Sequence, residues 1–205
     1  MKKVLFILLV CTLLISSMAF AKEFPDVAST HWAHQYISEL SDQGVINGYE
    51  DGTYRPNGTV TRAEFLKLMI CTDQTRVSLL DDLEKNYGLE FDNWYEKYRK
   101  MAAKILTFSY NENMNAPVNR LEMARIIKDF AMYDKLVESD SASSNVDFYD
   151  IKNLSANDQK TIDTIRKLGI ISGYEDETFR PTNNMTRAEV SAVILRYKNK
   201  KGGNN

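Results

Sequence analysis

The sequence repeats itself at a fixed offset, and this repetition limits the possible fold more than any other feature. The segment 48–56 recurs 125 residues later as 173–181, and Thr61-Arg62-Ala63-Glu64 recurs as Thr186-Arg187-Ala188-Glu189 at the same offset. That offset is about twice the length of a usual repeat, so a third copy is expected between the two. Units of this size bury their apolar faces only by packing on one another.

A degenerate middle copy lies where the offset predicts it. The segment 118–123 aligns with 60–65 and keeps Arg120 and Glu122, but the loop sequence of 48–56 has no counterpart there. We divide the chain into repeat one at 22–75, a connecting segment at 76–89, repeat two at 90–135, a linker at 136–145, repeat three at 146–198 and a flexible tail at 199–205. Within the connecting segment, Ser78 to Gly88 is expected to form a short helix.

Each copy has the apolar spacing of two helices separated by a loop. In repeat one, Trp32, Tyr36 and Leu40 recur every four residues, and repeat two has Trp94 and Tyr98 at the same spacing. We expect these stripes to form the core. One helical hairpin of about 50 residues cannot bury both of its faces. The sequence therefore predicts an all-α protein whose three helix-loop-helix repeats form a compact pseudo-trimer within one chain.

The first 21 residues have the pattern of a secretory signal peptide. Lys2 and Lys3 precede an apolar run from Val4, and Ala19 and Ala21 supply the small residues of a cleavage site. That run is too short for a membrane span, and no later run approaches about 20 apolar residues. The net charge of −2 argues against a nucleic-acid partner. We expect a secreted protein without a membrane span.

Few residues here are arranged for catalysis or metal binding. Cys71 would be the one cysteine left after cleavage, so we expect a buried thiol and no internal disulfide. His31 and His34 are three residues apart, but the chain has no other histidine, and a solvated helix start explains them better than a metal site. Nucleophile signatures and carboxylate pairs placed across a substrate are not found. The sequence predicts no enzyme, metal site or cofactor.

Each copy has a second-helix start in the form of a capping box, in which Glu64, Glu122 and Glu189 follow the cap residues Thr61, Asn119 and Thr186. Capping needs no arginine after the cap, yet all three copies have one: Arg62, Arg120 and Arg187. A cation at this place opposes the helix dipole. One explanation is that the guanidinium and the free first-turn N–H groups hold an anion. The other is a salt bridge to an acid of a neighbouring repeat, such as Asp26 or Asp150. The residues alone favour neither.

Taken together, these motifs resemble the S-layer homology (SLH) domain family. Repeat one matches almost throughout, repeat three matches from Leu168 to Leu195, and repeat two matches mainly at Trp94 and around Arg120. The residues of repeat one that carry the resemblance are Phe24, Asp26, Val27, Trp32, Ile37, Gly44-Val45-Ile46, Gly48-Tyr49, Asp51-Gly52-Thr53-Tyr54, Pro56 and Thr61-Arg62-Ala63-Glu64-Phe65.

The resemblance implies a function. SLH domains usually occur in threes and attach secreted proteins non-covalently to secondary cell-wall polysaccharide, which often carries pyruvate ketals. The arginine after the cap is similar in role to a ligand for the pyruvyl carboxylate, so the resemblance favours anion binding. Arg62 and Arg187 carry over directly, whereas around Arg120 the residues Asn119 and Leu121 depart from the motif. We expect Arg62→Ala to weaken wall binding without unfolding the protein, and unfolding would favour the salt bridge.

The ligand-binding residues implied by the resemblance are Arg62, Arg187, Arg120, Thr61, Thr186, Asp26, Trp32, Gly48 and Gly173. Trp32 or Tyr49 could stack on a sugar face, although Trp32 fits the core equally well. The missing loop of repeat two puts one groove in question. The expected location is the cell wall or S-layer. The alternative function is that of an SLH-only protein which spaces or cross-links other surface proteins.

Overall fold

The computed structural model describes residues 23–87, 91–107, 113–137 and 148–203. Within these ranges the regular structure is helical, and extended pairing is limited to isolated bridges between loops and helix starts. The prediction of an all-α fold is confirmed. The predicted signal peptide lies outside the described residues, as does most of the predicted linker at 136–145.

Each repeat contributes two α-helices, and repeat three adds a short 3₁₀ helix. Repeat one has α2 (His34–Asp42) and α3 (Arg62–Cys71), repeat two has α5 (Glu96–Ala102) and α6 (Arg120–Tyr133), and repeat three has the short 3₁₀ helix η2 (Tyr149–Ile151) followed by α7 (Ala156–Lys167) and α8 (Arg187–Gly202). The connecting segment forms α4 (Gln74–Tyr87), which begins four residues before the predicted start. Helix α8 continues to Gly202, into the segment predicted to be a flexible tail.

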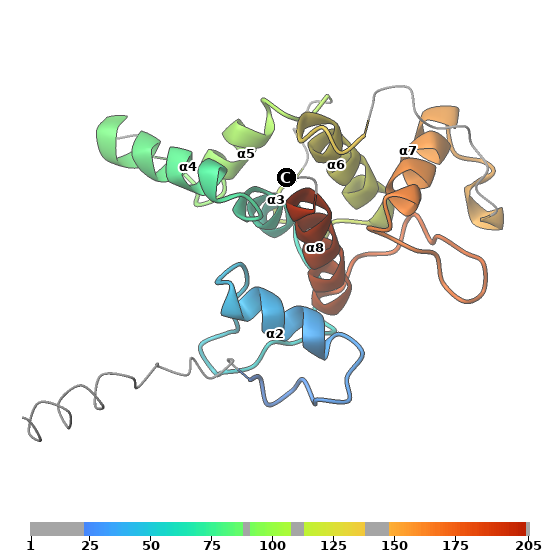
Figure 1. Cartoon of the computed structure of the whole chain (residues 1–205), viewed down its shortest axis with the longest axis horizontal. Helices are drawn as coiled ribbons and strands as arrows, with labels where there is room; N and C mark the ends of the chain where they lie inside the picture. Colours follow the sequence, from blue (N-terminus) through green and yellow to red (C-terminus); the bar gives the residue numbers. More distant parts are fainter. Residues whose placement is uncertain (1–22, 88–90, 108–112, 138–147, 204–205) are drawn as a thin grey trace, which may run out of the picture.

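The main helix pairs join different repeats. Helix α3 of repeat one packs on α5 of repeat two, and α6 of repeat two packs on α7 of repeat three. Helix α8 of repeat three then packs on α2 of repeat one, so that the order closes on itself (Figure 1). The chain therefore folds as a ring of three repeats in which each second helix receives the first helix of the next repeat.

A ring of three backbone hydrogen bonds lies at the centre of this arrangement. The Val60 N–H donates to the Met185 carbonyl at 3.1 Å, Met185 donates to Val118 at 3.0 Å, and Val118 donates back to Val60 at 2.9 Å. The three side chains are buried. Equivalent residues of the three copies thus meet around one axis, and the predicted pseudo-trimer is confirmed.

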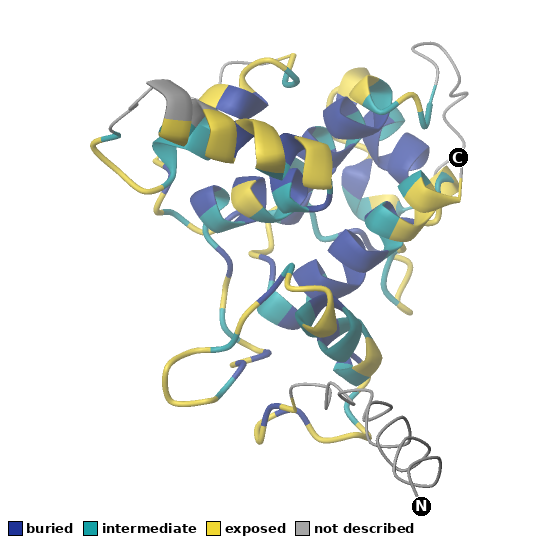
Figure 2. Ribbon diagram, turned by 60° about the vertical axis from the view of Figure 1, so that its left-hand side comes forward, coloured by how far each residue is buried: buried dark blue, intermediate teal, exposed yellow. Residues whose placement is uncertain are grey.

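The core lies where the helices meet, and the loops between them remain largely exposed (Figure 2). Most of the predicted apolar stripes are buried, including Ile37 and Leu40 of α2. The prediction is wrong for two residues: Trp32 is 58% exposed and Trp94 is 52% exposed. Both stand just before the first helix of their repeat, so their rings lie beyond the surface that the helix buries. Cys71 is half-buried rather than buried, and burial raises the pKa of its thiol.

Candidate functional site

All three predicted capping boxes are present. In repeat one, the Thr61 N–H donates to Glu64 Oε2 at 2.7 Å, and the Glu64 N–H donates to Thr61 Oγ1 at 3.3 Å. The boxes of Asn119 with Glu122 and of Thr186 with Glu189 have the same form. The hydroxyls of Thr61 and Thr186 also donate to their glutamates at 2.9 Å, so the geometry around both threonines is that of a cap.

The first-turn N–H groups point at protein carbonyls, not at a ligand site. The Arg62 N–H donates to Ala116 O at 3.0 Å, and the Arg187 N–H donates to Gly58 O at 2.8 Å. Arg120 likewise donates to Asn183 O at 3.0 Å. The expectation that free N–H groups at these helix starts hold an anion is therefore wrong. The ring is the reason, because it places a loop of another repeat across each helix start.

The side chain of Arg187 lies on the loop of repeat one. Its Nε donates to Tyr54 O at 2.7 Å, and its Nη2 donates to Asn47 O at 3.1 Å. The guanidinium carbon is 4.3 Å from the centre of the Tyr54 ring and 4.9 Å from that of Tyr49. A cavity of about 160 Å³ opens here, lined by Asn47, Tyr54, Glu64, Lys67 and Arg187. We call it the repeat-one groove.

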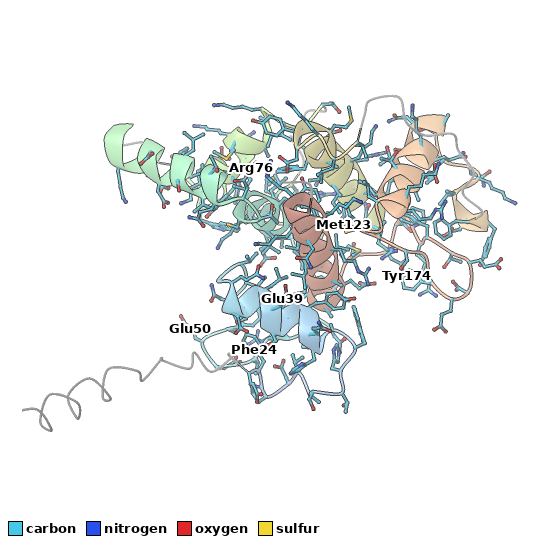
Figure 3. The ribbon with its side chains drawn as sticks, in the orientation of Figure 1. Phe24, Glu39, Glu50, Arg76, Met123 and Tyr174 are labelled. Carbon is cyan, nitrogen blue, oxygen red and sulfur yellow. The ribbon has the colours of Figure 1, made fainter. Side chains whose placement is uncertain are left out.

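Arg120 makes matching contacts on the loop of repeat three. Its Nε donates to Phe179 O at 2.7 Å, and its Nη2 donates to Ser172 O at 3.1 Å. The guanidinium carbon lies 4.6 Å from the centre of the Tyr174 ring, and Tyr174 is labelled on its loop in Figure 3. A cavity of about 210 Å³ opens here, lined by Trp32, Arg120, Ser172, Tyr174, Glu189 and Arg196. We call it the repeat-three groove.

The charge of Arg120 is buried with little neutralisation. The residue is 4% exposed, and burial lowers the pKa of its guanidinium. Its hydrogen bonds from Nε and Nη2 go to neutral carbonyls, and the nearest carboxylate oxygen, Glu189 Oε1, is 3.7 Å from Nη1. Burial works to raise the pKa of Glu189, but hydrogen bonds from Thr186 and Tyr174 lower it overall. Its Nη1 also donates to Met185 Sδ at 3.8 Å. The groove therefore holds a cation whose ion pair with Glu189 is long.

Arg62 has a different environment. Its Nε donates to Glu122 Oε2 at 3.2 Å, its Nη2 donates to Glu122 Oε1, and its Nη1 donates to Asn113 O at 3.2 Å. The Arg62 and Glu122 side chains are only 13% and 17% exposed. At this junction the salt-bridge explanation is confirmed, with Glu122 as the acid instead of Asp26 or Asp150. Residues 108–112, which would form the facing loop, lie outside the described residues.

Asp26 and its equivalent Asp150 hold the turns beside the grooves. The Asp26 carboxylate accepts the N–H groups of Tyr54 at 2.8 Å and Arg55 at 2.6 Å. Burial opposes ionisation of Asp26, yet these two bonds lower its pKa. Asp150 accepts from Phe179 and Arg180 in the same way. Arg55 has φ +58°, a left-handed conformation that a non-glycine residue keeps only when its surroundings hold it there.

Gly48 and Gly173 are required by close packing under the same turns. A Cβ on Gly48 would lie 2.4 Å from Phe24 Cε1 and 2.7 Å from Thr53 O. On Gly173 it would lie 2.0 Å from Phe148 Cε1. The absence of a side chain at Gly48 and Gly173 thus lets the rings of Phe24 and Phe148 pack directly under the two loops. Gly173 also lines the repeat-three groove, whereas Gly48 does not line the repeat-one groove.

Trp32 lies at the mouth of the repeat-three groove, although it belongs to repeat one. Its ring stacks on His31 at a centroid distance of 5.8 Å and meets Tyr36 edge-on at 6.4 Å. Tyr36 in turn accepts a hydrogen bond from Arg196 Nη2 at 3.1 Å. Of the two explanations for Trp32, the structure excludes the core and leaves a surface aromatic beside a groove.

Several residues that line the grooves were not predicted as ligands from the sequence. Arg196, Lys67 and Tyr174 are among them. Tyr174 is the partner of Tyr49 at the 125-residue offset, so the repeat itself contained that signal. Lys67 lies on α3 and Arg196 on α8, each C-terminal to the capping box of its helix. The packing of the three repeats into a ring places both side chains beside the grooves, and the sequence alone does not show that packing.

The described residues contain no group of three or more His, Cys, Asp or Glu side chains placed to hold a metal ion. Among their helices, none combines the length and the apolar character that crossing a bilayer requires.

Comparison with known proteins gives one family. The model of the S-layer homology domain matches residues 23–66 and 147–191, which fall within repeats one and three. An amylopullulanase of Thermoanaerobacterium thermosulfurigenes is 29% identical over 91% of this chain, which is 10% of that protein. The S-layer protein sap of Bacillus anthracis is 25% identical over 87% of this chain and 21% of its own length. A cellulosome-anchoring protein of Acetivibrio thermocellus is 25% identical over 84% of this chain and 25% of its own. The chain thus spans a quarter or less of each of these relatives.

Proposed function

Because residues 23–66 and 147–191 are S-layer homology domains, we propose that this protein binds non-covalently to an anionic polysaccharide of the cell wall. The proposed ligand group is a carboxylate of the pyruvyl-ketal type, and the proposed binding residues are Arg120 and Arg187. We propose no catalytic activity and a location at the cell wall or S-layer. The names of two relatives, an S-layer protein and a cellulosome-anchoring protein, support that location.

The observation that carries the proposal is the buried, under-neutralised guanidinium of Arg120. A buried cation normally has a close carboxylate partner, as Arg62 has in Glu122. Arg120 is surrounded by carbonyl oxygens, ring faces and the Met185 sulfur, and its ion pair with Glu189 is long, at 3.7 Å. A ligand carboxylate that replaces the weak Met185 contact at Nη1 would supply a closer counter-charge through a charge-assisted hydrogen bond of about 1.5–3 kcal/mol.

The two grooves give the proposed binding its strength and its orientation. Arg187 holds the same carbonyl contacts in the repeat-one groove, and its Nη1 has no hydrogen bond to any described residue. The exposed ring of Trp32 offers an apolar face for a sugar beside the repeat-three groove. Two grooves meeting one repeating polymer would raise the apparent affinity by about 10²–10⁴-fold over a single groove. We propose a valency of two, because Glu122 already occupies Arg62 at the third junction.

The test is sedimentation of the protein with native cell-wall sacculi and with sacculi from which pyruvate has been removed by mild acid. We expect binding to native walls alone. Arg187→Gln and Arg120→Gln should each weaken binding by about tenfold or more, and Arg166→Gln, a half-exposed arginine of α7 outside both grooves, serves as the matched control. Melting curves check that each variant is folded. Equal binding to both kinds of wall would contradict the proposal and favour a protein partner.

A further inference from the structure

A second cavity borders the repeat-one groove and shares Lys67 with it. It measures about 380 Å³ and is lined by Lys67 of α3, Glu84 of α4, Lys97 of α5 and, just before α5, Asn93 and Trp94. Helix α4 belongs to the connecting segment, outside both segments matched by the family model. The cavity is therefore built partly from an element outside the segments that the family model matches.

Trp94 forms an exposed and rigid wall of this cavity. Its side chain is 52% exposed, so burial of the ring contributes little to the core. Its ring is nevertheless fixed: it meets Tyr95 edge-on at 5.8 Å and Tyr98 edge-on at 6.2 Å between ring centres. A pre-oriented indole with an open face gives apolar contact area at little cost in side-chain entropy.

The polar groups around the ring are two ammonium groups, one carboxylate and one amide. Lys97 Nζ lies 2.8 Å from Glu84 Oε1, so the ammonium and the carboxylate neutralise each other. Asn93 adds an amide, which both donates and accepts hydrogen bonds. An aromatic face beside alternating donors and acceptors suits a neutral ring that carries hydroxyl groups.

Lys67 connects the cavity to the repeat-one groove. Its side chain lines both, and its ammonium lies 5.9 Å from the centre of the Trp94 ring. We propose that this cavity, the Trp94 subsite, binds a neutral pyranose residue of the same polymer whose anionic residue is held by Arg187. This inference rests on the proposed function of the repeat-one groove. It extends the bound glycan from that groove into the neighbouring cavity, so that at least two sugar residues are held.

The repeat-three groove is built differently at the matching place. Ala192 stands at the position that corresponds to Lys67, at the 125-residue offset. Trp32 lines that groove directly instead of a neighbouring cavity. We therefore infer that the two grooves differ in reach, with the repeat-one groove recognising an additional uncharged sugar.

The two tryptophans of the chain make this testable by nuclear magnetic resonance. The indole N–H signals are two in number, and Trp94→Phe and Trp32→Phe assign them. The probes are wall-polysaccharide fragments of one residue and of one full repeating unit, and separately the methyl glycoside of N-acetylglucosamine at millimolar concentration. We expect the Trp94 signal to move with the longer fragment and with the neutral glycoside, but not with the single pyruvylated sugar.

Affinities measured by titration calorimetry give the second readout. Lengthening the fragment should raise the affinity of the wild type. Trp94→Ala should bind the longer fragment about tenfold more weakly than the wild type does, and it should bind the single sugar as before. Tyr133→Ala removes another exposed aromatic ring, on α6 away from the subsite, and should change neither value. An unchanged gain in Trp94→Ala, or a Trp94 signal that none of the probes moves, would overturn the inference. Failure of every charged fragment to bind would refute the proposed function instead, and the neutral glycoside would still decide the subsite.

Discussion

Breaking the Arg62–Glu122 pair should destabilise the fold more than it weakens wall binding. The two side chains share a bidentate contact, with Nε 3.2 Å from Oε2, and are 13% and 17% exposed. Such a pair lies between exposed pairs, worth about 0–1 kcal/mol, and fully buried ones, whose disruption costs about 3–5 kcal/mol. We therefore expect Arg62→Met to lower the free energy of unfolding by about 2–3 kcal/mol.

A double-mutant cycle isolates the pair. Glu122→Gln removes the charge but keeps an oxygen for the Asn119 N–H, so the capping box survives. Urea unfolding of both single variants and the double variant should give a coupling energy of about 1.5–2 kcal/mol. The exposed Arg180–Asp176 pair, treated in the same way, should couple far more weakly. A coupling below about 0.5 kcal/mol for Arg62 with Glu122 would refute this explanation and return Arg62 to the candidate ligand residues.

Three further predictions follow from the turns and the ion pairs. Gly173→Ala should lower stability by about 2–4 kcal/mol in thermal melts because its Cβ would overlap Phe148, whereas Gly202→Ala, which has open space, should be neutral or slightly stabilising; equal effects would contradict the packing argument. Glu177 has φ +58° where repeat one has Gly52, so Glu177→Gly should raise stability by roughly 0.5–1 kcal/mol, and a loss would show that the turn is not strained. Arg125 and Ser155 lower the pKa of Asp158 against the effect of burial, and Lys201 and Arg76 lower that of Asp73, also against burial. Because the unfolded chain then takes up protons first, the stability these carboxylates confer should be complete above about pH 5 and decline below about pH 4. Arg125→Met should flatten that decline in urea titrations at each pH, and an unchanged pH profile would argue against the Arg125–Asp158 pair.

The sequence predicts the local chemistry of the helix starts well. Thr61, Asn119 and Thr186 form capping boxes because that geometry depends on residues three apart and on little else. The all-α class and the threefold arrangement follow from the repeat. Glu177 illustrates what the pattern leaves open: it replaces Gly52 at the 125-residue offset, and the structure nevertheless keeps φ at +58°.

What sequence could not supply was the direction of the ring. Reading each repeat as a unit associates Arg62 with the loop of repeat one, but the structure places Arg187 there and gives Arg62 to repeat two. The partner of Arg62 was missed for a related reason. The sequence assigns Glu122 to the capping box alone, whereas its carboxylate accepts hydrogen bonds from both the Asn119 N–H and the Arg62 guanidinium. The exposure of Trp32 and Trp94 likewise depends on which helix covers each stripe, and that is a property of the assembled ring.

In the closed ring, the start of each second helix contributes both to the contact between repeats and to the loop of the next repeat. The helix start of repeat two donates to Asn183 and supplies Arg120 to the repeat-three groove. Damage to that start would therefore open the ring and disable a neighbour. Repeat two has no counterpart of the 48–56 sequence, and it still fills its place in the ring through α5, α6 and the backbone hydrogen bonds of Val118.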